Sequence, residues 1–415
     1  MADEYKLDQT NSVQLLTGIK SERFFVITFA IFSFSILSEI VPTGLIVFFS
    51  FLSFVAAIIV IKSRMGSSIL SPLNLIFISP FIWLSITCMW GGSDFLQSLE
   101  AIFEYRFYIL TIVFSIALSF VPGRRVMIEN IFIFSIALAV VFSYLLYFSV
   151  IDVQGAKESL KGRIFHGFIV NLGVVLLLGK LVVKEKFNLE KIVYLFLIIF
   201  FVANIFFIER GRTAYITFYF LICTFLIFSL TQRSLSANLI FFPLIGSLVF
   251  ISLLSSNFLE NISLSLSQVN DFFLKNDQGT SIGKRLVFYS GAFEIAKENV
   301  FFGVGLSGLD PALADAFNTG VMGRLTDNVH SEIATQYLAG GLIGLAIFFG
   351  SLSYIVYAAY SAKNQRIYWL VLGCLTVLLI SGIFNSVIKD FGEKHAFLVV
   401  FSLVLSELRD LREPA

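Results

Sequence analysis

Long apolar runs separated by short polar loops fill almost the whole chain. Phe, Leu and Ile occupy every face of these runs, and the strict alternation typical of a β-strand is absent. A backbone in lipid must satisfy its own hydrogen bonds, so such runs predict membrane-spanning helices. The expected fold is an all-α polytopic membrane protein with about twelve transmembrane helices, at 24–41, 43–61, 73–90, 107–121, 131–151, 164–183, 192–208, 213–230, 238–254, 333–360, 367–385 and 395–408.

The composition agrees with this pattern. Of 415 residues, 57% are hydrophobic and 14% are charged, whereas soluble proteins have about 45–50% apolar and about 25% charged residues. This excludes a soluble enzyme with one anchor and a disordered chain. Cys88, Cys223 and Cys374 all lie in apolar runs, which argues against a disulfide framework or a thiolate metal site. The formal net charge of +1 gives no reason to expect nucleic acid as a partner.

Basic residues in the short loops predict the orientation. If the N-terminus is cytoplasmic, the cytoplasmic loops hold about twice as many Lys and Arg residues as the opposite side. The chain then divides into residues 1–254, with helices 1–9 and a cytoplasmic N-terminus, a periplasmic cap loop at 255–329, and residues 330–415, with helices 10–12 and a cytoplasmic C-terminus.

The long loop between helices 9 and 10 is expected to be partly helical. Apolar residues recur at helical spacing from Phe258 to Phe273, which predicts an amphipathic helix on the membrane surface. A second helix is predicted over 281–299, followed by a return rich in turns at Gly303, Gly305 and Gly308. Long loops of this kind are usually functional.

Several arginines lie on the side that the charge bias disfavours. These are Arg163, Arg210, Arg212 and Arg285. Guanidinium groups bind phosphate oxygens two at a time, so arginines beside apolar surface suit a diphosphate headgroup whose tail lies in lipid. The alternative is structural: they extend along the membrane surface, fix helix ends, or pair with Glu158, Glu209 or Glu294.

His330 ends the long loop and enters helix 10. Imidazole titrates near neutrality and can accept a proton from a hydroxyl, although a lone histidine at a helix start is more often a cap or packing residue. His166 and His395 are interpreted as packing residues. The chain has no nucleotide-binding loop, no zinc-binding histidine pair and no acidic pair beside the arginines. We therefore expect no metal and no cofactor.

At this point the motifs show a resemblance. His330-Ser331, nine residues and then Gly341-Leu342-Ile343-Gly344 resembles a motif of O-antigen ligases. Gly211-Arg212-Thr213 is similar to that family's pair of Thr or Gly followed by Arg at the start of a span. Gly283-Lys284-Arg285-Leu286, Tyr289 and Phe302-Gly303-Val304-Gly305 resemble the family's cap helix and the return after it. The resemblance extends to the arrangement of the whole chain, with its long loop before helix 10.

The resemblance implies a reaction and its partners. Such enzymes are glycosyltransferases that move O-antigen polysaccharide from undecaprenyl diphosphate to lipid A–core, in lipopolysaccharide synthesis at the bacterial inner membrane. Fixed guanidinium groups stabilise the charge that grows on the leaving diphosphate, and His330 is the expected base for the acceptor hydroxyl. The active site is expected on the periplasmic side, in contact with membrane lipid. Metal-independent transfer would invert the anomeric centre.

Other functions remain open. Within the superfamily, the alternatives are an O-antigen polymerase and an oligosaccharyltransferase that modifies protein. A protein-modifying member often has a further soluble domain at its C-terminus, whereas this sequence stops soon after its last apolar run. In a different class, a transporter of lipid-linked glycan would show internal repeats and charges near the bilayer midplane. The charges here gather at one surface, and no repeat is visible.

Overall fold

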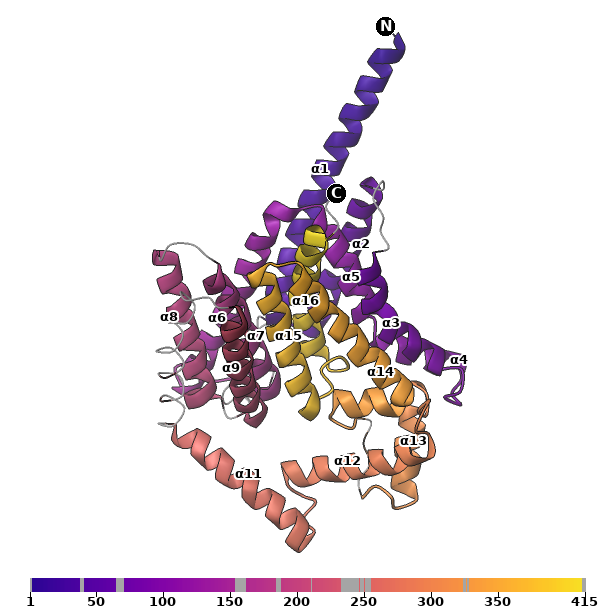
Figure 1. Ribbon diagram of the computed structural model, residues 1–415, viewed down its shortest axis with the longest axis vertical. Coiled ribbons are helices and arrows are strands. Elements are labelled where there is room, and N and C mark those ends of the chain that lie inside the picture. Colours follow the sequence, from indigo (N-terminus) through magenta and orange to yellow (C-terminus); the bar gives the residue numbers. More distant parts are fainter. Residues whose placement is uncertain are drawn as a thin grey trace.

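The computed structural model describes residues 2–37, 41–64, 71–153, 162–183, 188–209, 211–232, 246, 250, 255–323, 326 and 328–412, and no strand occurs among them. A 3₁₀ turn at Pro122–Arg124 and a π-helical turn at Asn204–Ile208 interrupt the helices (Figure 1). The α-helices are α1 (Ala2–Leu37), α2 (Thr43–Ser63), α3 (Pro72–Thr87), α4 (Phe95–Glu104), α5 (Phe107–Ser119), α6 (Arg125–Tyr147), α7 (Arg163–Val182), α8 (Leu189–Ala203), α9 (Arg212–Gln232), α11 (Ser256–Lys275), α12 (Ser281–Glu298), α13 (Leu309–Asn318), α14 (Glu332–Ser361), α15 (Gln365–Phe384) and α16 (Phe391–Arg412).

The all-α prediction is confirmed for the described residues, but the count of twelve spans is not. Among the residues that the structure describes, seven helices are long and apolar enough to cross a membrane, or eight if α4 and α5 form one span bent by 47°. The span expected at 73–90 is a 16-residue helix, α3. The one expected at 131–151 begins earlier, at Arg125, and ends at Tyr147. The span expected at 238–254 falls almost entirely outside the described residues.

Helices α7 and α16 form the interior of the bundle. In the most apolar 18-residue stretch of α7, 83% is buried inside the protein. Small residues allow this close packing, since a Cβ on Gly167 would lie 2.5 Å from the Cβ of Ala214 on α9. Helix α15 packs on both α7 and α9, and Trp369 donates a hydrogen bond to the carbonyl of Val175 at 2.9 Å. The start of α7 is thereby fixed beside the start of α9, and both ends contribute to the site described below.

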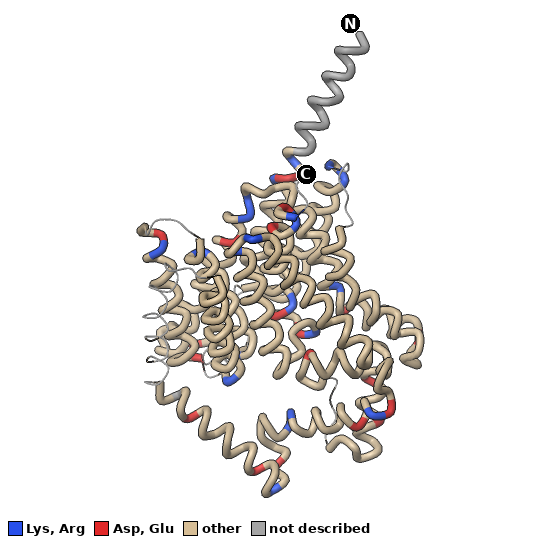
Figure 2. Tube along the Cα trace, in the orientation of Figure 1, with Lys and Arg blue, Asp and Glu red and all other residues tan. Residues whose placement is uncertain are grey.

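Ion pairs join the helices at the end of the bundle that carries both termini. Figure 2 shows many Lys and Arg residues there. Glu129 on α6 pairs with Arg366 at 2.7 Å and with Lys180 at 3.6 Å. Arg125 pairs with Asp410 at 2.5 Å. Because these charges lie among apolar helices, their pairing spares the cost of burying each one alone.

At the other end, α11, α12 and α13 lie across the bundle (Figure 1). Helices α11 and α12 match the two that the sequence predicts, whereas α13 is a third, unpredicted helix in the return. Phe258 anchors the beginning of α11, because its ring packs against Phe206, Tyr215 and Tyr219 at 5.3–5.6 Å between centroids.

Helix α14 is broken at Gly341, where φ is +65° and ψ is −164°. The segment 300–305 lies in the break and forms four backbone hydrogen bonds with α14: Val304 to Leu338 at 2.7 Å, Gly305 to Ala339 at 3.2 Å, Leu342 to Val300 at 2.9 Å and Ile343 to Phe301 at 3.3 Å. A Cβ on Gly341 would lie 2.2 Å from the backbone of Phe301. The glycines at 303 and 341 therefore allow the two backbone segments to pair, a role that requires the absence of side chains.

Candidate functional site

His330 lies in the loop before α14 with left-handed backbone geometry, at φ +53°. Non-glycine residues adopt this conformation rarely. The side chain of Asn328 stabilises it, because its Oδ1 accepts a hydrogen bond from the His330 amide at 2.8 Å and another from the Ser386 hydroxyl at 2.6 Å. Its Nδ2 lies 3.5 Å from Asp390 Oδ1. Asn328 thus connects His330 to the loop between α15 and α16.

Helix α12 packs directly against His330. The ring of Phe288 lies 5.8 Å from the imidazole, centroid to centroid. The hydroxyl of Tyr289 donates to the carbonyl of Ile383 at 2.7 Å and lies 3.3 Å from the carbonyl of His330. Burial raises the pKa of Tyr289, and the charge of Arg285 lowers it in part. The phenol is therefore protonated near neutral pH and acts as a donor.

Arg285 precedes Tyr289 by one helical turn, so both side chains lie on the same face of α12. Burial lowers the pKa of Arg285, and the neighbouring Tyr289 raises it in part. Arginine starts from so high a value that its guanidinium stays charged. A partly buried, permanent positive charge is therefore held on the face of α12 that meets His330.

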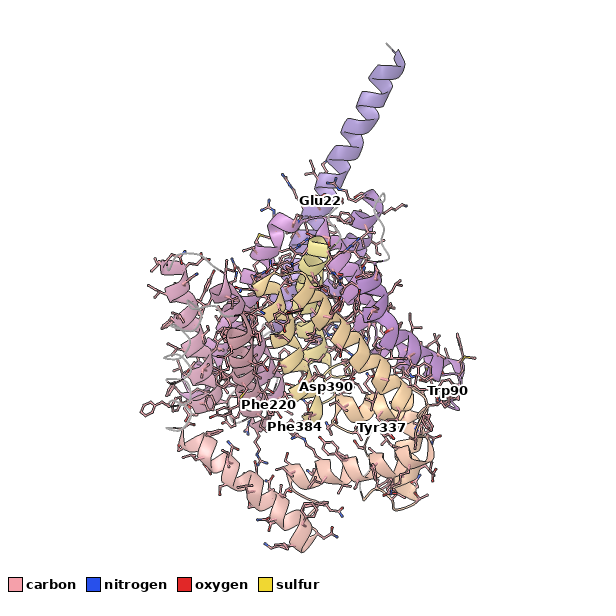
Figure 3. All side chains as sticks on the ribbon, in the orientation of Figure 1. Glu22, Trp90, Phe220, Tyr337, Phe384 and Asp390 are labelled. Carbon is pink, nitrogen blue, oxygen red and sulfur yellow. The ribbon has the colours of Figure 1, made fainter. Side chains whose placement is uncertain are left out.

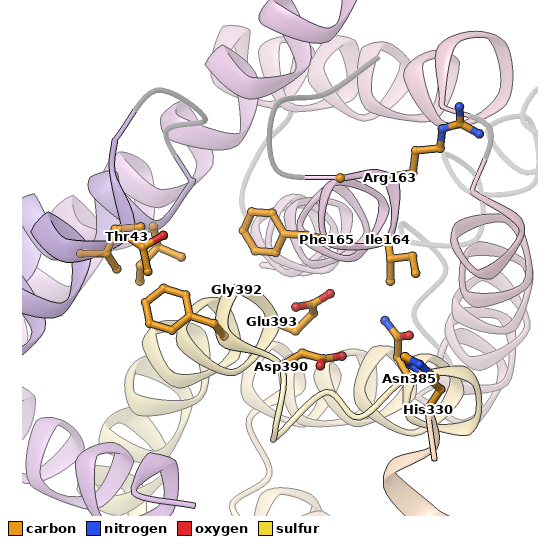
Figure 4. Close-up of a pocket in the computed structure, with 13 residues that line it drawn as sticks. Thr43, Arg163, Ile164, Phe165, His330, Asn385, Asp390, Gly392 and Glu393 are labelled. Carbon is orange, nitrogen blue, oxygen red and sulfur yellow. The ribbon is translucent and has the colours of Figure 1, made fainter. Parts of the chain in front are cut away.

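A cavity of about 460 Å³ opens beside His330 and is also lined by Arg163, Asn385, Asp390 and Glu393 (Figure 4). The close-up shows His330, Asn385 and the two carboxylates grouped on one side, at the ends of α15 and α16. Arg163 is on the opposite wall, at the start of α7, and its guanidinium extends away from the carboxylates. Asp390 and Phe384 both lie at the end of the bundle that faces α12 (Figure 3).

Arg212 begins α9 and contacts the neighbouring helix α11. Its Nη1 donates a hydrogen bond to Gln268 Oε1 at 2.7 Å. Burial lowers the pKa of Arg212, and the positive charge of Arg285 lowers it further. Two cations held near one another in partly buried surroundings are unfavourable by themselves and favour binding of an anion between them. Arg210, the fourth predicted arginine, lies outside the described residues.

A buried carboxylate, that of Glu209, lies beside the backbone at Gly211. Glu209 has 0% exposure, and its Oε1 is 3.1 Å from where a Cβ on Gly211 would be. The backbone carbonyl of Arg163 is 3.6 Å from the same point. The structure thus brings the starts of α7 and α9 together around Gly211, and a side chain at that position would crowd the carboxylate.

The predicted site residues therefore fall into two adjoining groups. Arg212 and Arg285 interact electrostatically across α9, α11 and α12. His330 and Arg163 line one cavity. The contact of His330 with Phe288 and Tyr289 connects the groups, since those residues and Arg285 belong to the same helix. Glu332, with 1% exposure, supports this junction: its Oε2 accepts a hydrogen bond from the Ile388 amide at 3.0 Å.

The sequence analysis missed the carboxylates beside His330. Asp390 and Glu393 lie three residues apart at the start of α16 and share the cavity with His330 and Asn385. Their signal in the sequence is a pair of acids next to an apolar run, flanked by the basic residues Lys389 and Lys394. No group of three His, Cys, Asp or Glu side chains in the described part of the chain is arranged to hold a metal ion.

The other two histidines are buried in the bundle, in agreement with their interpretation as packing residues. His166 has 0% exposure, and its Nε2 lies 2.9 Å from Asn204 Oδ1 at the π-helical turn. His395 Nδ1 lies 2.6 Å from the Phe391 carbonyl. Glu294, considered as a partner for an arginine, pairs instead with Lys297 at 2.8 Å.

Comparison with known proteins identifies the central part of this arrangement. Residues 195–349 match the family model described as O-antigen ligase. The matched segment runs from within α8 to within α14, and it contains Arg212, Arg285 and His330. No curated protein gives a significant match to the chain. The chain is a multi-pass helical membrane protein, and its residues 195–349 carry a domain of the O-antigen ligase superfamily.

Proposed function

We propose that this protein is an O-antigen ligase of the bacterial inner membrane. It transfers a polysaccharide from undecaprenyl diphosphate to a sugar hydroxyl of lipid A–core, on the periplasmic side. The observation that carries this proposal is the packing of α12 on His330. One helix holds a partly buried arginine and also contacts a histidine that lines a cavity.

Arg212 and Arg285 are the proposed diphosphate ligands, with Arg163 and Arg210 as further cations. When the anomeric C–O bond breaks, the electron pair leaves with the diphosphate, and negative charge grows on its oxygens. Guanidinium groups already held in place stabilise that charge without reorganising. The Gln268 contact fixes the Arg212 side chain, and burial fixes Arg285, so little side-chain entropy is lost on binding.

His330 is the proposed base. The acceptor hydroxyl attacks the anomeric carbon as its proton passes to the imidazole, on the face opposite the leaving diphosphate, so the anomeric configuration inverts. The resulting imidazolium is stabilised by Asp390, whose carboxylate lines the same cavity and lies 3.5 Å from Asn328 Nδ2. Asp390 and Glu393 repel a diphosphate, so they are assigned to the side of the sugar hydroxyls.

A reconstituted transfer reaction tests this function. Purified protein is mixed with undecaprenyl-diphosphate-linked glycan and rough lipopolysaccharide, without ATP, and the products are separated on a gel. A ladder on lipid A–core supports the ligase. Longer lipid-linked glycan in place of that ladder indicates a polymerase, and glycan on added protein indicates an oligosaccharyltransferase. The His330→Ala variant serves as the control for contaminating activity.

A further inference from the structure

A second cavity of about 510 Å³ lies on the far side of the loop that carries Asp390. It is bounded by α4, by the start of α13 and by Lys389. Lys389 and Asp390 are consecutive residues, yet Lys389 lines this second cavity and Asp390 lines the cavity of His330. Both amides donate to the Ser386 carbonyl, at 2.9 and 2.7 Å, which makes the loop a tight turn between the two cavities.

Helix α4 has two different faces. One face carries the exposed apolar side chains Phe95, Leu96, Leu99 and Phe103. The other face lines the second cavity with Gln97, Glu100, Ala101 and Glu104. The helix is bent by 47° from α5, and the guanidinium of Arg106 stacks on Phe103 at 4.5 Å. A short helix with this division of side chains is typical of one lying in the membrane interface.

The exposed apolar surface continues from α4 towards the end of α3. Met89 is 85% exposed, and Trp90, at the outer edge of the molecule in Figure 3, is 40% exposed. Trp90, Trp83 and Phe302 form an aromatic cluster with centroids 6.1–6.4 Å apart. Tryptophan is enriched at the level of lipid headgroups. The second cavity thus adjoins the membrane surface, where the sugars of a glycolipid are found.

The charges of the second cavity define what it can bind. Glu100, Glu104 and Asp310 contribute three carboxylates against the single cation of Lys389. Lys389 lies 3.8 Å from Glu104 and 3.9 Å from Asp310, and so holds two of the carboxylates in place. The excess negative charge repels phosphate and acidic sugars. Carboxylates accept strong hydrogen bonds from hydroxyl groups, which are the donors that a neutral sugar provides.

Two buried hydroxyls in the same wall also need a partner. Tyr105 is 1% exposed and Ser307 is 7% exposed, and both line the cavity. Neither hydroxyl oxygen has a hydrogen-bond partner among the residues that the structure describes. Buried polar atoms are normally satisfied. Leu306, Leu309 and Pro311 supply apolar surface beside them, on which the C–H face of a sugar ring packs.

We propose that this second cavity binds neutral outer sugars of the glycolipid acceptor, while its acyl chains lie in the membrane beside the apolar face of α4. The inference rests on the proposed function and extends it by naming a separate acceptor subsite. The 386–390 turn separates this subsite from the cavity of His330, so one acceptor glycan reaches across the turn from one cavity to the other.

Photo-cross-linking tests the subsite without requiring catalysis. The photo-cross-linker p-benzoylphenylalanine replaces Gln97 in the His330→Ala variant, and the protein is placed in nanodiscs with increasing mole fractions of rough lipopolysaccharide. We expect cross-linking that saturates. With Glu104→Gln or Asp310→Asn, half-saturation should require roughly tenfold more lipopolysaccharide or more, because hydrogen bonds to charged groups are the strong ones.

The matched control is Asp315→Asn, an exposed acid on the same helix as Asp310 that does not line the cavity. It should saturate like the parent. Glu100→Gln replaces either variant that fails to elute as a folded protein. Equal half-saturation in the parent and in all cavity variants would overturn the proposal. So would equal cross-linking to deep-rough lipopolysaccharide, which lacks the neutral outer sugars, because it would mean that only the lipid is bound.

The cross-linking experiment and the transfer assay can fail independently of one another. Cross-linking that depends on Glu104 and Asp310 supports the subsite even if the transfer assay gives no product, in which case the ligase assignment fails by itself. A transfer reaction that proceeds normally in the Glu104→Gln and Asp310→Asn variants overturns the acceptor subsite and leaves the ligase assignment standing.

Discussion

The hydroxyl of Tyr289 lies 3.3 Å from the backbone carbonyl of His330, and it donates at 2.7 Å to the carbonyl of Ile383. One side chain of α12 thereby contacts both the loop before α14 and the end of α15. Because Arg285 is one turn away on the same helix, the position of the proposed diphosphate ligand depends on the same contact that positions the proposed base.

Replacing Tyr289 with Phe removes these hydrogen bonds but keeps the ring. A typical hydrogen bond contributes about 0.5–1.5 kcal/mol, so we expect the transfer rate to fall by a few-fold to about tenfold. Donor and acceptor titrations of the purified variant measure this. Tyr357→Phe is the control, because Tyr357 is 61% exposed on the far part of α14. A rate equal to that of the control would show that α12 is held by its other contacts.

His330→Ala should remove most of the transfer rate while the protein stays folded and still binds donor. General bases contribute about 10²–10⁴-fold. In the parent enzyme the rate should also fall as the pH decreases, because a protonated imidazole cannot accept the acceptor's proton. Single-turnover rates across the pH range provide the measurement. A variant within a few-fold of the parent would assign His330 to packing.

Arg212→Lys and Arg285→Lys should each be strongly impaired in donor affinity and in turnover. Lysine keeps the charge but loses the planar fork that binds two phosphate oxygens. Arg124→Lys, an exposed arginine at the opposite end of the bundle, is the control and should behave like the parent. Near-normal kinetics in both site variants would favour the structural alternative, in which these arginines only fix helix ends.

Chelation with EDTA should leave the transfer rate unchanged, because the proposed diphosphate ligands are arginines. The test compares the initial rate in EDTA with the rates after addition of magnesium or manganese. Loss of activity in EDTA that either cation restores would show that a metal ion takes part in neutralising the diphosphate.

Gly341→Ala should destabilise the protein strongly. A Cβ would lie 2.2 Å from the Phe301 backbone, at a φ of +65° that alanine adopts at a cost. We expect a loss of at least about 1–3 kcal/mol, seen as a lower apparent Tm in detergent. Gly350→Ala is the matched control in the same helix, since no atom lies within 4 Å of its Cβ position, and alanine there should stabilise by up to about 1 kcal/mol. Equal Tm values for both variants would mean that the segment at 300–305 moves aside.

Apolar periodicity was enough to predict the long apolar helices of the described bundle and the two helices α11 and α12, but not α4, which lies between two predicted spans. It was not enough for α13, a ten-residue helix whose Leu309, Leu313 and Ala316 are buried against other parts of the fold. Nor did it show the break in α14, because a glycine pair such as Gly340-Gly341 is equally compatible with close packing of an unbroken helix. The break depends on a partner segment forty residues away, which spacing within one helix cannot reveal.

The candidate site was predictable where its chemistry was unusual for its position. Arginines opposing the charge bias and a histidine at a helix start were visible as exceptions in the sequence. Asp390 and Glu393 were not, because acids next to a span are common and only the fold brings them beside His330. The contact between Arg212 and Gln268 likewise joins helices whose relative position no local pattern determines.

The backbone pairing of 300–305 with α14 bears on how a long polymer enters. The segment that contains α11 and α12 is attached at both ends, by Phe258 in its aromatic cluster and by the four hydrogen bonds between 300–305 and α14. A segment fixed at two points has the most freedom in its middle, around the α11–α12 turn, which separates Gln268 from Arg285. In the proposed function, the same element would both hold the diphosphate and border the path of the glycan.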